Sequence, residues 1–359
     1  MWHATYPEAM RSGEFRFATW VAAVAAGVTL LMAWVYDLPV RDPDNTEHYL
    51  VPTYVRLPLI LLAAVAVDIV PRAVRRSRRS ANGLRAEVRA VVAERWTCRE
   101  VRFVLVGLVT WYVAYVSYRN VKSYVPFVNT HLWDGWLQDT DRLFFLGHDP
   151  AVLLHDLLGR DWAAHALSYV YVSWMVLVPL TLAVALVWSR NRGAGEWYVT
   201  AVALDWVLGA LTYLALPALG PVYADPETFA GLADTHVSRL QAGMMAERQE
   251  VLVNPFTAET VQMIAAFTSL HVAICVTFCV FAELLRMRRS LRVAAWVYLA
   301  LTSVATIYLG WHYLLDLVGG AALGVAACWV AAVGTGHEFR RVPVATGQSR
   351  SSPARSRVA

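Results

Sequence analysis

The sequence predicts an all-α integral membrane protein with about eight transmembrane helices. Of its 359 residues, 58% are hydrophobic and only 16% are charged, whereas soluble domains are about 45–50% apolar and about 25% charged. Apolar segments recur along the chain at close to the roughly 20 residues that cross a bilayer core. Arginine-rich connections alternate with acidic ones. Together these observations exclude an ordinary soluble domain.

The predicted spans form a continuous series along most of the chain. They cover residues 15–36, 51–71, 103–124, 165–188, 196–218, 265–285, 293–311 and 312–335. The first run is longer than the about 7–15 residues of a signal-peptide core, so we interpret it as a spanning helix. The last two spans meet at Gly310–His312, which leaves almost no loop between them.

The charges of the connections predict an orientation. Arginines follow every second span, and arginine-rich short loops remain in the cytoplasm. The alternate loops carry aspartates such as Asp42, Asp139 and Asp225. We therefore expect both termini in the cytoplasm and an extracytoplasmic site in a bacterial plasma membrane. The formal net charge of +4 is spread over connections between spans, so nucleic acid is not an expected partner.

Three regions are predicted from this pattern. Residues 1–102 comprise two N-terminal transmembrane helices and a basic cytoplasmic linker, residues 103–335 a six-helix catalytic membrane domain, and residues 336–359 a disordered cytoplasmic tail. Apolar residues recur at helical spacing in the linker, with arginines opposite them. That pattern is typical of a helix on an anionic leaflet, although an ordinary solvated connector fits it too. The tail has too little apolar content to fold alone.

His312 and Asp316 form the strongest chemical signal. They are four residues apart at the head of the last span, so they are expected to share a helix face. A carboxylate beside an imidazole fixes one tautomer and leaves the other nitrogen free to attack. An aspartate inside a spanning helix is expensive without a partner. The alternative is a polar pair that only holds two helices together.

A second histidine adds a proton donor to this pair. His271 follows Thr268 and Ser269 at the start of the sixth span, where hydroxyls and free backbone N–H groups would hold a phosphate. The histidine could then protonate a leaving oxygen. With His312 as nucleophile and Asp316 orienting it, these residues predict double displacement through a phosphohistidine. This chemistry requires neither a metal nor another cofactor.

Two short motifs resemble those of a known family. Ser269-Leu270-His271 is similar to the Pro-Ser-x-His motif of the type 2 phosphatidic acid phosphatase superfamily. The segment Tyr308-Leu309-Gly310-x-His312-Tyr313-x-x-Asp316 is similar to its third motif, whose histidine is the family's nucleophile. The resemblance covers residues 103–332 and implies a six-helix core that acts on a lipid phosphate.

The departures from the family pattern favour one branch. Thr268 replaces the motif's proline, and Ala305-Thr306 occupy the places of the family's Ser-Arg. A segment from Pro217 to Tyr223 stands where the first, cationic motif is expected. This pattern is more similar to the inositol phosphorylceramide synthase branch, which transfers a phosphoryl head group between lipids. The resemblance therefore implies a transferase and places Tyr223 near the substrate.

Some cation must still balance the phosphate charge. Arg119 and Lys122 lie at the outer end of the third span, where the positive-inside tendency disfavours them. We predict that they contact the phosphate or the head group. Arg239 and Arg248, before the sixth span, are further candidates. The alternative for all four is snorkelling to the interface or a surface ion pair.

Other readings remain open at this stage. With water as acceptor, the protein would be a lipid phosphate or pyrophosphate phosphatase of the same superfamily; without catalysis, it would be a lipid carrier or transporter. A catalyst with two titrating histidines should give a bell-shaped pH–rate profile near neutral pH. Asp205, within the fifth span, could relay a proton or make a buried hydrogen bond. Gly320-x-x-x-Gly324 predicts close helix packing.

Overall fold

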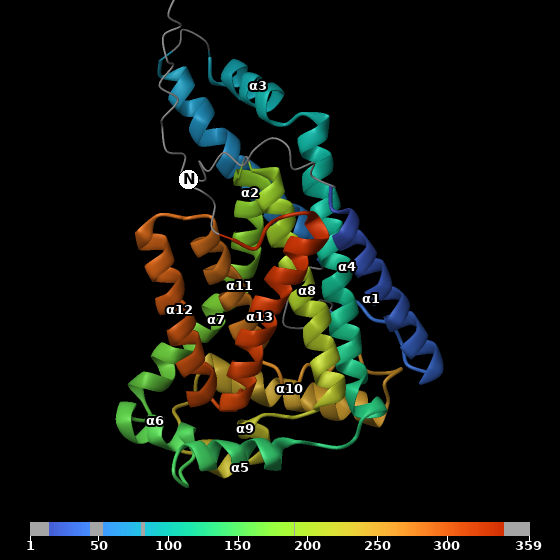
Figure 1. Ribbon diagram of the computed structural model, residues 1–359, viewed down its shortest axis with the longest axis vertical. Helices are drawn as coiled ribbons and strands as arrows, with labels where there is room; N and C mark the ends of the chain where they lie inside the picture. Colours follow the sequence, from blue (N-terminus) through green and yellow to red (C-terminus); the bar gives the residue numbers. More distant parts are fainter. Residues whose placement is uncertain (1–13, 44–52, 80–82, 190, 341–359) are drawn as a thin grey trace, which may run out of the picture.

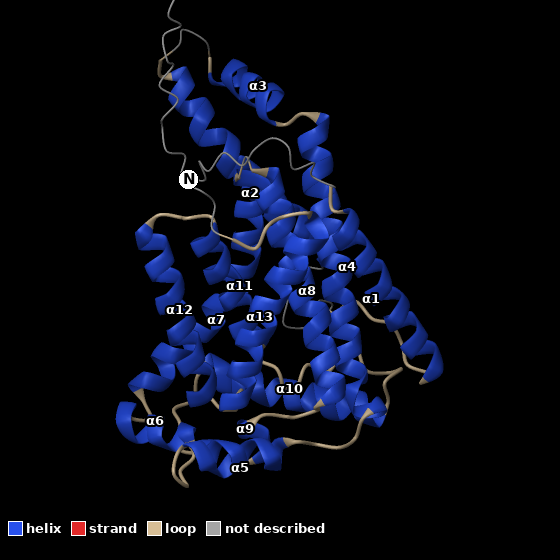
Figure 2. Ribbon diagram, viewed as in Figure 1, coloured by secondary structure: helices blue, strands red, loops and turns tan. Residues whose placement is uncertain are grey.

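The chain folds into a bundle of helices that run alongside one another (Figure 1). The computed structural model describes residues 14–43, 53–79, 83–189 and 191–340, and these contain helices but no strand (Figure 2). The bundle consists of α1 (Arg16–Val35), α4 (Cys98–Val128), α7 (Trp162–Ala183), α8 (Arg192–Ala215), α11 (Leu270–Leu284), α12 (Arg289–Tyr308) and α13 (Leu314–Thr335).

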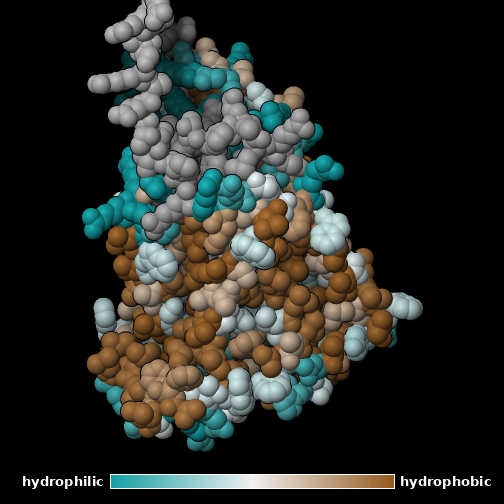
Figure 3. Space-filling model, viewed as in Figure 1, coloured by the Kyte–Doolittle hydropathy of each residue, from teal (hydrophilic) through white to brown (hydrophobic). Residues whose placement is uncertain are grey.

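Six of the helices in the described part are long and apolar enough to cross a membrane. These are α1, α4, α7 with its π-helical extension Val184–Trp188, α8, α12 and α13. Figure 3 shows the corresponding broad belt of hydrophobic side chains, with hydrophilic residues toward both ends of the molecule. The prediction of an all-α integral membrane protein is therefore confirmed.

The other two predicted spans are also helical, but they differ from the six. The sixth span begins five residues later than predicted, because Ser269 caps α11 and leaves a helix of only 15 residues. The second span becomes α2 (Thr53–Ser77), which contains Pro58 and Pro71. It packs mainly on the short helix α3 (Leu84–Arg95) of the predicted linker.

The predicted linker helix exists, and part of its apolar face is covered, although Leu84 and Val92 are exposed. Val91 of α3 is fully buried and packs with Ile69 and Ala73 of α2. Arg95 of α3 also makes an ion pair with the buried Asp68 of α2, at 2.7 Å. Part of the face that could have lain on a leaflet therefore holds α3 against α2.

Helix α8 forms the centre of the bundle and packs on α4, α11 and α13. Helices α11 and α13 approach each other closely because of two glycines. A Cβ atom on Gly320 would lie 2.3 Å from the carbonyl oxygen of Ser269, and one on Gly324 would lie 2.4 Å from that of Ala273. Close packing at this glycine pair is thus confirmed, and it brings the starts of α11 and α13 together.

Short helices lie across the end of the bundle where α11 and α13 begin (Figure 1). They are α5 (Asp134–Phe144), α6 (Pro150–Leu158), α9 (Pro221–Ala224), the 3₁₀ helix η2 (Pro226–Phe229) and α10 (His236–Val253). Acidic loops were expected for these segments, because none has the apolar length of a span.

The two ends of the bundle differ in charge. His271 and His312 lie at one end, which we call the histidine end. Arg192 begins α8 at the opposite end, and Arg286 and Arg288 connect α11 to α12 there; we call it the arginine end (Figure 1). The alternation of basic connections along the sequence therefore corresponds to one end of the structure.

The predicted region boundaries fall close to helix ends. The boundary at residue 102 lies inside the first turns of α4, which packs on both α1 and α8. Of the predicted tail, residues 341–359 lie outside the described residues. His337, at the start of that tail, packs on the Trp197 ring at a centroid distance of 5.2 Å.

Candidate active site

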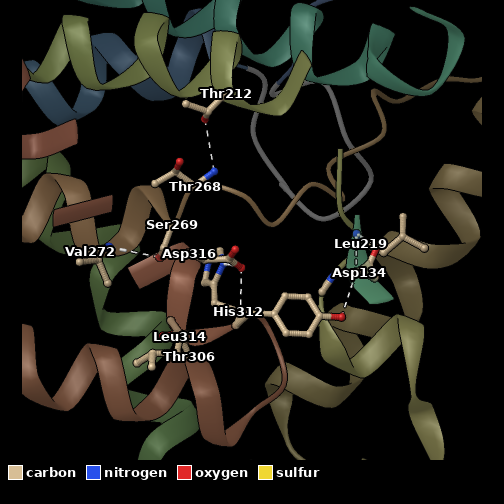
Figure 4. A network of polar contacts seen from close by, with 12 residues as sticks. Asp134, Thr212, Leu219, Thr268, Ser269, Val272, Thr306, His312, Leu314 and Asp316 are labelled. Atoms are coloured by element: carbon tan, nitrogen blue, oxygen red, sulfur yellow. Dashed lines mark hydrogen bonds and ion pairs between the residues drawn. The ribbon is translucent and has the colours of Figure 1, made fainter. Parts of the chain in front are cut away.

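His312 and Asp316 lie beside Ser269 where α11 and α13 begin (Figure 4), and His271 is the second residue of α11. The backbone N–H of Ser269 donates to the carbonyl oxygen of Asp316 at 3.0 Å, which ties the two helix starts together. The His271 and His312 rings have a centroid distance of 5.7 Å. Residues 41 positions apart in the chain therefore form one cluster.

His312 contacts Asp316 from a turn, whereas the sequence analysis placed both residues on one helix. Gly310, with φ +74°, reverses the chain after α12, and α13 begins only at Leu314. The Asp316 Oδ2 atom accepts the backbone N–H of Tyr313 at 2.9 Å and lies 3.2 Å from His312 Nδ1. Asp316 thus caps its own helix and orients the imidazole at the same time.

The environment of His312 keeps its imidazole neutral. The side chain is buried. Burial is the main cause that lowers the pKa of His312 to about 3; the charge of Lys122 adds to this effect, and the backbone of Ala266 opposes it. A neutral imidazole that donates from Nδ1 to Asp316 carries its lone pair on Nε2. This is the protonation state that a nitrogen nucleophile needs.

Aromatic rings surround the second histidine. His271 is the second residue of α11, and its ring centroid lies 4.4 Å from that of Trp174 and 4.8 Å from that of Tyr171. Tyr171 in turn stacks on Trp311, the residue before His312, at 5.0 Å. These rings fix the position of His271 next to His312 and exclude bulk water from that side.

Ser269 and Thr268 lie at the cluster, but both already have structural contacts. The Ser269 hydroxyl accepts the N–H of Val272 at 3.4 Å and thereby caps α11. The backbone N–H of Thr268 donates to the Thr212 hydroxyl at 3.3 Å, and its side chain packs against Gly319. Their predicted contact with a phosphate remains a prediction.

Of the predicted cations, Lys122 is the one placed beside the histidines. Its ammonium lies 4.8 Å from the centre of the Tyr213 ring and 5.9 Å from that of Tyr118. Its charge contributes to the lowered pKa of His312. Within the described residues, no carboxylate lies within 4.0 Å of this ammonium, so an incoming anion has no protein carboxylate to displace there.

The other two predicted binding residues, Arg119 and Tyr223, make hydrogen bonds within the protein. Arg119 donates to the Tyr115 hydroxyl at 2.8 Å and to the Pro43 carbonyl at 3.3 Å. The Tyr223 hydroxyl donates to the Gln241 carbonyl at 3.2 Å, and its ring meets that of Trp311 edge-on at 6.2 Å. Both remain predicted substrate contacts.

Two aspartates of α5 hold the histidine turn from outside, which the sequence analysis did not predict. Asp134 accepts the N–H groups of Leu219 and Gly220 and the Tyr313 hydroxyl, all at 2.8–3.0 Å. Asp141 accepts the N–H of Leu314, the first residue of α13, with both oxygens at 3.0 Å. Burial raises the pKa of Asp141 to about 6, although the Leu314 N–H opposes this shift.

A seven-residue spacing places Asp134 and Asp141 on one face of a helix. The spacing does not show which groups pack against that face, so the contacts of the two aspartates could not be predicted from it. Asp205, by contrast, makes the buried hydrogen bond that was one of its two readings. It accepts the Thr277 hydroxyl at 2.9 Å.

The fold and the cluster define a class: an integral membrane protein with two neighbouring histidines, a buried carboxylate and a lysine at one end of a helix bundle. The model of one protein family, the PAP2 superfamily, matches residues 135–330, which is more than half of the chain. The protein belongs to the PAP2 superfamily. Membership indicates a phosphatase-type membrane enzyme that transfers or hydrolyses a phosphoryl group. Neither a curated protein nor a solved structure matches the chain.

Proposed function

We propose that this protein transfers a phosphoryl head group from a lipid phosphate to an alcohol through a phosphohistidine intermediate. The observation that carries the proposal is the buried His312, whose Nδ1 atom lies 3.2 Å from Asp316 Oδ2 and whose ring centroid lies 5.7 Å from that of His271. In this proposal the Nε2 atom attacks phosphorus and His271 supplies the proton.

The first half-reaction forms the intermediate. The Nε2 atom of His312 attacks phosphorus, the bond from phosphorus to the leaving oxygen breaks, and His271 gives that oxygen a proton. Asp316 stabilises the positive charge that develops on the imidazole. Lys122 balances the phosphate charge. Ser269, Thr268, Arg119 and Tyr223 are proposed to position the substrate.

The second half-reaction returns the enzyme to its starting state. An acceptor oxygen attacks the phosphohistidine, its proton passes to His271, and the bond between nitrogen and phosphorus breaks. An alcohol acceptor gives a new phospholipid, as in the inositol phosphorylceramide synthase branch, whereas water gives free phosphate.

The local structure around Thr306 supports the transferase branch. Thr306 occupies the place of the family's arginine and is fully buried. Its carbonyl oxygen accepts the N–H of Trp311 at 2.9 Å and that of His312 at 3.3 Å. The Thr306 backbone therefore holds the His312 turn, and its side chain provides no positive charge. In the proposal, Lys122 balances the negative charge of the phosphate.

The test is a product analysis with purified protein in detergent. A panel of lipid phosphates and diphosphates is offered with and without alcohol acceptors, and lipid products and free phosphate are followed. We expect a new phospholipid that disappears in His312→Ala and persists in His236→Ala, an exposed histidine at the same end. Free phosphate alone would support the phosphatase; lipid binding or transport without any covalent product would support the carrier.

We also propose that the histidine end faces away from the cytoplasm, since arginine-rich short loops stay inside. Cys98 offers a native probe, because it is exposed at the start of α4 whereas Cys275, Cys279 and Cys328 are buried. In intact cells, an impermeant maleimide should label Cys98 only after permeabilisation. His148→Cys, in the turn between α5 and α6, should be labelled without it. The reverse pattern would refute this orientation.

A further inference from the structure

The helix that holds the His312 turn has a second, apolar side. On its inner side α5 carries the buried Asp134 and Asp141, which accept backbone N–H groups near the histidines. Each aspartate is followed two residues later by a large apolar residue, Trp136 and Leu143 respectively, and two residues correspond to about 200° around a helix. Trp136 is 51% exposed and Leu143 is 78% exposed. Helix α5 therefore presents apolar side chains on the side away from the site.

Exposed apolar residues continue from α5 into α6 and the start of α7. Leu146, in the turn after α5, is 91% exposed, Leu157 of α6 is 77% exposed, and Trp162 at the start of α7 is 79% exposed. A large exposed apolar patch usually marks an interaction surface. We call this one the corner patch; it consists of Trp136, Leu143, Phe144, Leu146, Leu157 and Trp162.

The corner patch is continuous with the lipid-facing side of a spanning helix. Trp162 is the first residue of the candidate span formed by α7 and its extension. It is followed at intervals of seven residues by Tyr169 and Val176, so the three lie along one face of α7, and all three are exposed. Figure 3 shows hydrophobic side chains around the place of α6, at the lower left, that continue the belt over the spanning helices. The lipid that covers Val176 therefore extends to the corner patch.

Acidic residues beside the corner patch limit how deeply it can enter the membrane. Asp139, Asp156 and Asp161 are exposed, and an aspartate in the hydrocarbon is expensive. Tryptophans such as Trp136 and Trp162 favour the interface between head groups and acyl chains. The apolar side of an interfacial helix lies about 5–10 Å deep in this boundary. Carboxylates do not attract anionic lipids, so apolar contact must hold the corner there.

We propose that the corner patch is embedded in the lipid leaflet at the histidine end, with α5 and α6 lying along the interface between head groups and acyl chains. The polar His148, in the turn between them, lies on the water side of that interface. Because Asp134 and Asp141 join the opposite side of α5 to the His312 turn, this contact sets the histidines at the depth of the head groups. The proposal depends neither on the reaction nor on which leaflet this is.

Fluorescence in phosphatidylcholine nanodiscs tests the depth of the corner. Leu146→Cys and Leu157→Cys each carry a polarity-sensitive dye in a Cys98→Ser background, in which the remaining cysteines are buried. Val176→Cys, in the span, is the reference for lipid, and His236→Cys, exposed at the start of α10, is the reference for water. We expect emission at both corner positions to shift to the blue, close to the value at Val176→Cys. A nitroxide on the acyl chains should quench them several-fold more than it quenches His236→Cys, and iodide several-fold less.

Two results would overturn the proposal. Emission and iodide quenching equal to those of His236→Cys would place the corner in water. Protection from both quenchers, with energy transfer between labelled molecules, would mean that a second copy of the chain covers the patch. Added phosphatidylglycerol should leave the emission of Leu146→Cys unchanged; a further blue shift would refute apolar contact as the cause. Since no step measures turnover, loss of the proposed reaction would leave this result intact.

Discussion

Buried charges are treated in opposite ways at the two ends of the bundle. At the arginine end, the buried carboxylate of Asp68 pairs with Arg72 at 2.6 Å and with Arg95 at 2.7 Å. At the histidine end, the buried Asp134, Asp141 and Asp316 accept backbone N–H groups or a hydroxyl, while Lys122 and Arg248 keep no carboxylate within 4.0 Å among the described residues. The first arrangement cancels charge and stabilises the fold. The second leaves positive charge for an anion that comes from outside.

The largest effect is expected at the aspartate that orients the histidine. Asp316→Asn keeps the shape of the side chain but removes the carboxylate that holds His312 Nδ1 at 3.2 Å. Turnover should fall about 10³–10⁴-fold, as for the orienting aspartate of a catalytic triad. Initial rates and phosphohistidine trapping measure this loss. A variant with near-normal rates and normal melting would reduce Asp316 to a helix cap.

Removal of the free lysine tests the comparison directly. Lys122→Gln should lower kcat about 10²–10³-fold, because the charge opposite the developing anion is lost, and Lys122→Arg should restore part of it. The matched variant is Asp68→Asn at the arginine end, which should cost about 3–5 kcal/mol of stability and lower Tm while kcat stays within about twofold. If both variants changed only Tm, the distinction between the ends would fail.

The clamp from α5 is expected to have a smaller effect. Asp141→Asn keeps an acceptor for the Leu314 N–H but removes the negative charge at the start of α13. A displaced His312 turn should lower kcat by about 10–100-fold with little change in KM. Asp141→Glu should recover more activity than Asp141→Asn. A change in KM alone would show that Asp141 contacts substrate and does not position the turn.

Part of this architecture could be predicted from the sequence. The spans were predictable because membrane crossing imposes apolar length, and the contact of His312 with Asp316 was predictable from their spacing. The role of α5 was not, because Asp134 and Asp141 act on backbone groups that no residue type reveals. For α3, the sequence indicated the apolar face but not α2 as its cover. Lys122 was a candidate because a lysine at that end violates the charge pattern.

The smallest expected effect concerns pH, and it differs from the bell-shaped profile near neutral pH that two titrating histidines would give. Because burial holds the pKa of His312 near 3, against about 6.5 in an unfolded chain, the nucleophile stays unprotonated well below pH 5. The kcat/KM profile should therefore change less than about twofold between pH 5 and 7 on account of His312.

Stability behaves differently: below about pH 6.5 the unfolded chain binds a proton at His312 that the folded chain does not, so the folded state loses stability as pH falls toward 3. Thermal melting of wild type and His312→Gln from pH 7 to 4 measures this loss. The Tm of the wild type should fall more steeply with decreasing pH than the Tm of His312→Gln. An acid limb of activity near pH 6.5, or equal melting slopes for the two proteins, would show that His312 is solvated and that the histidine end is open to water.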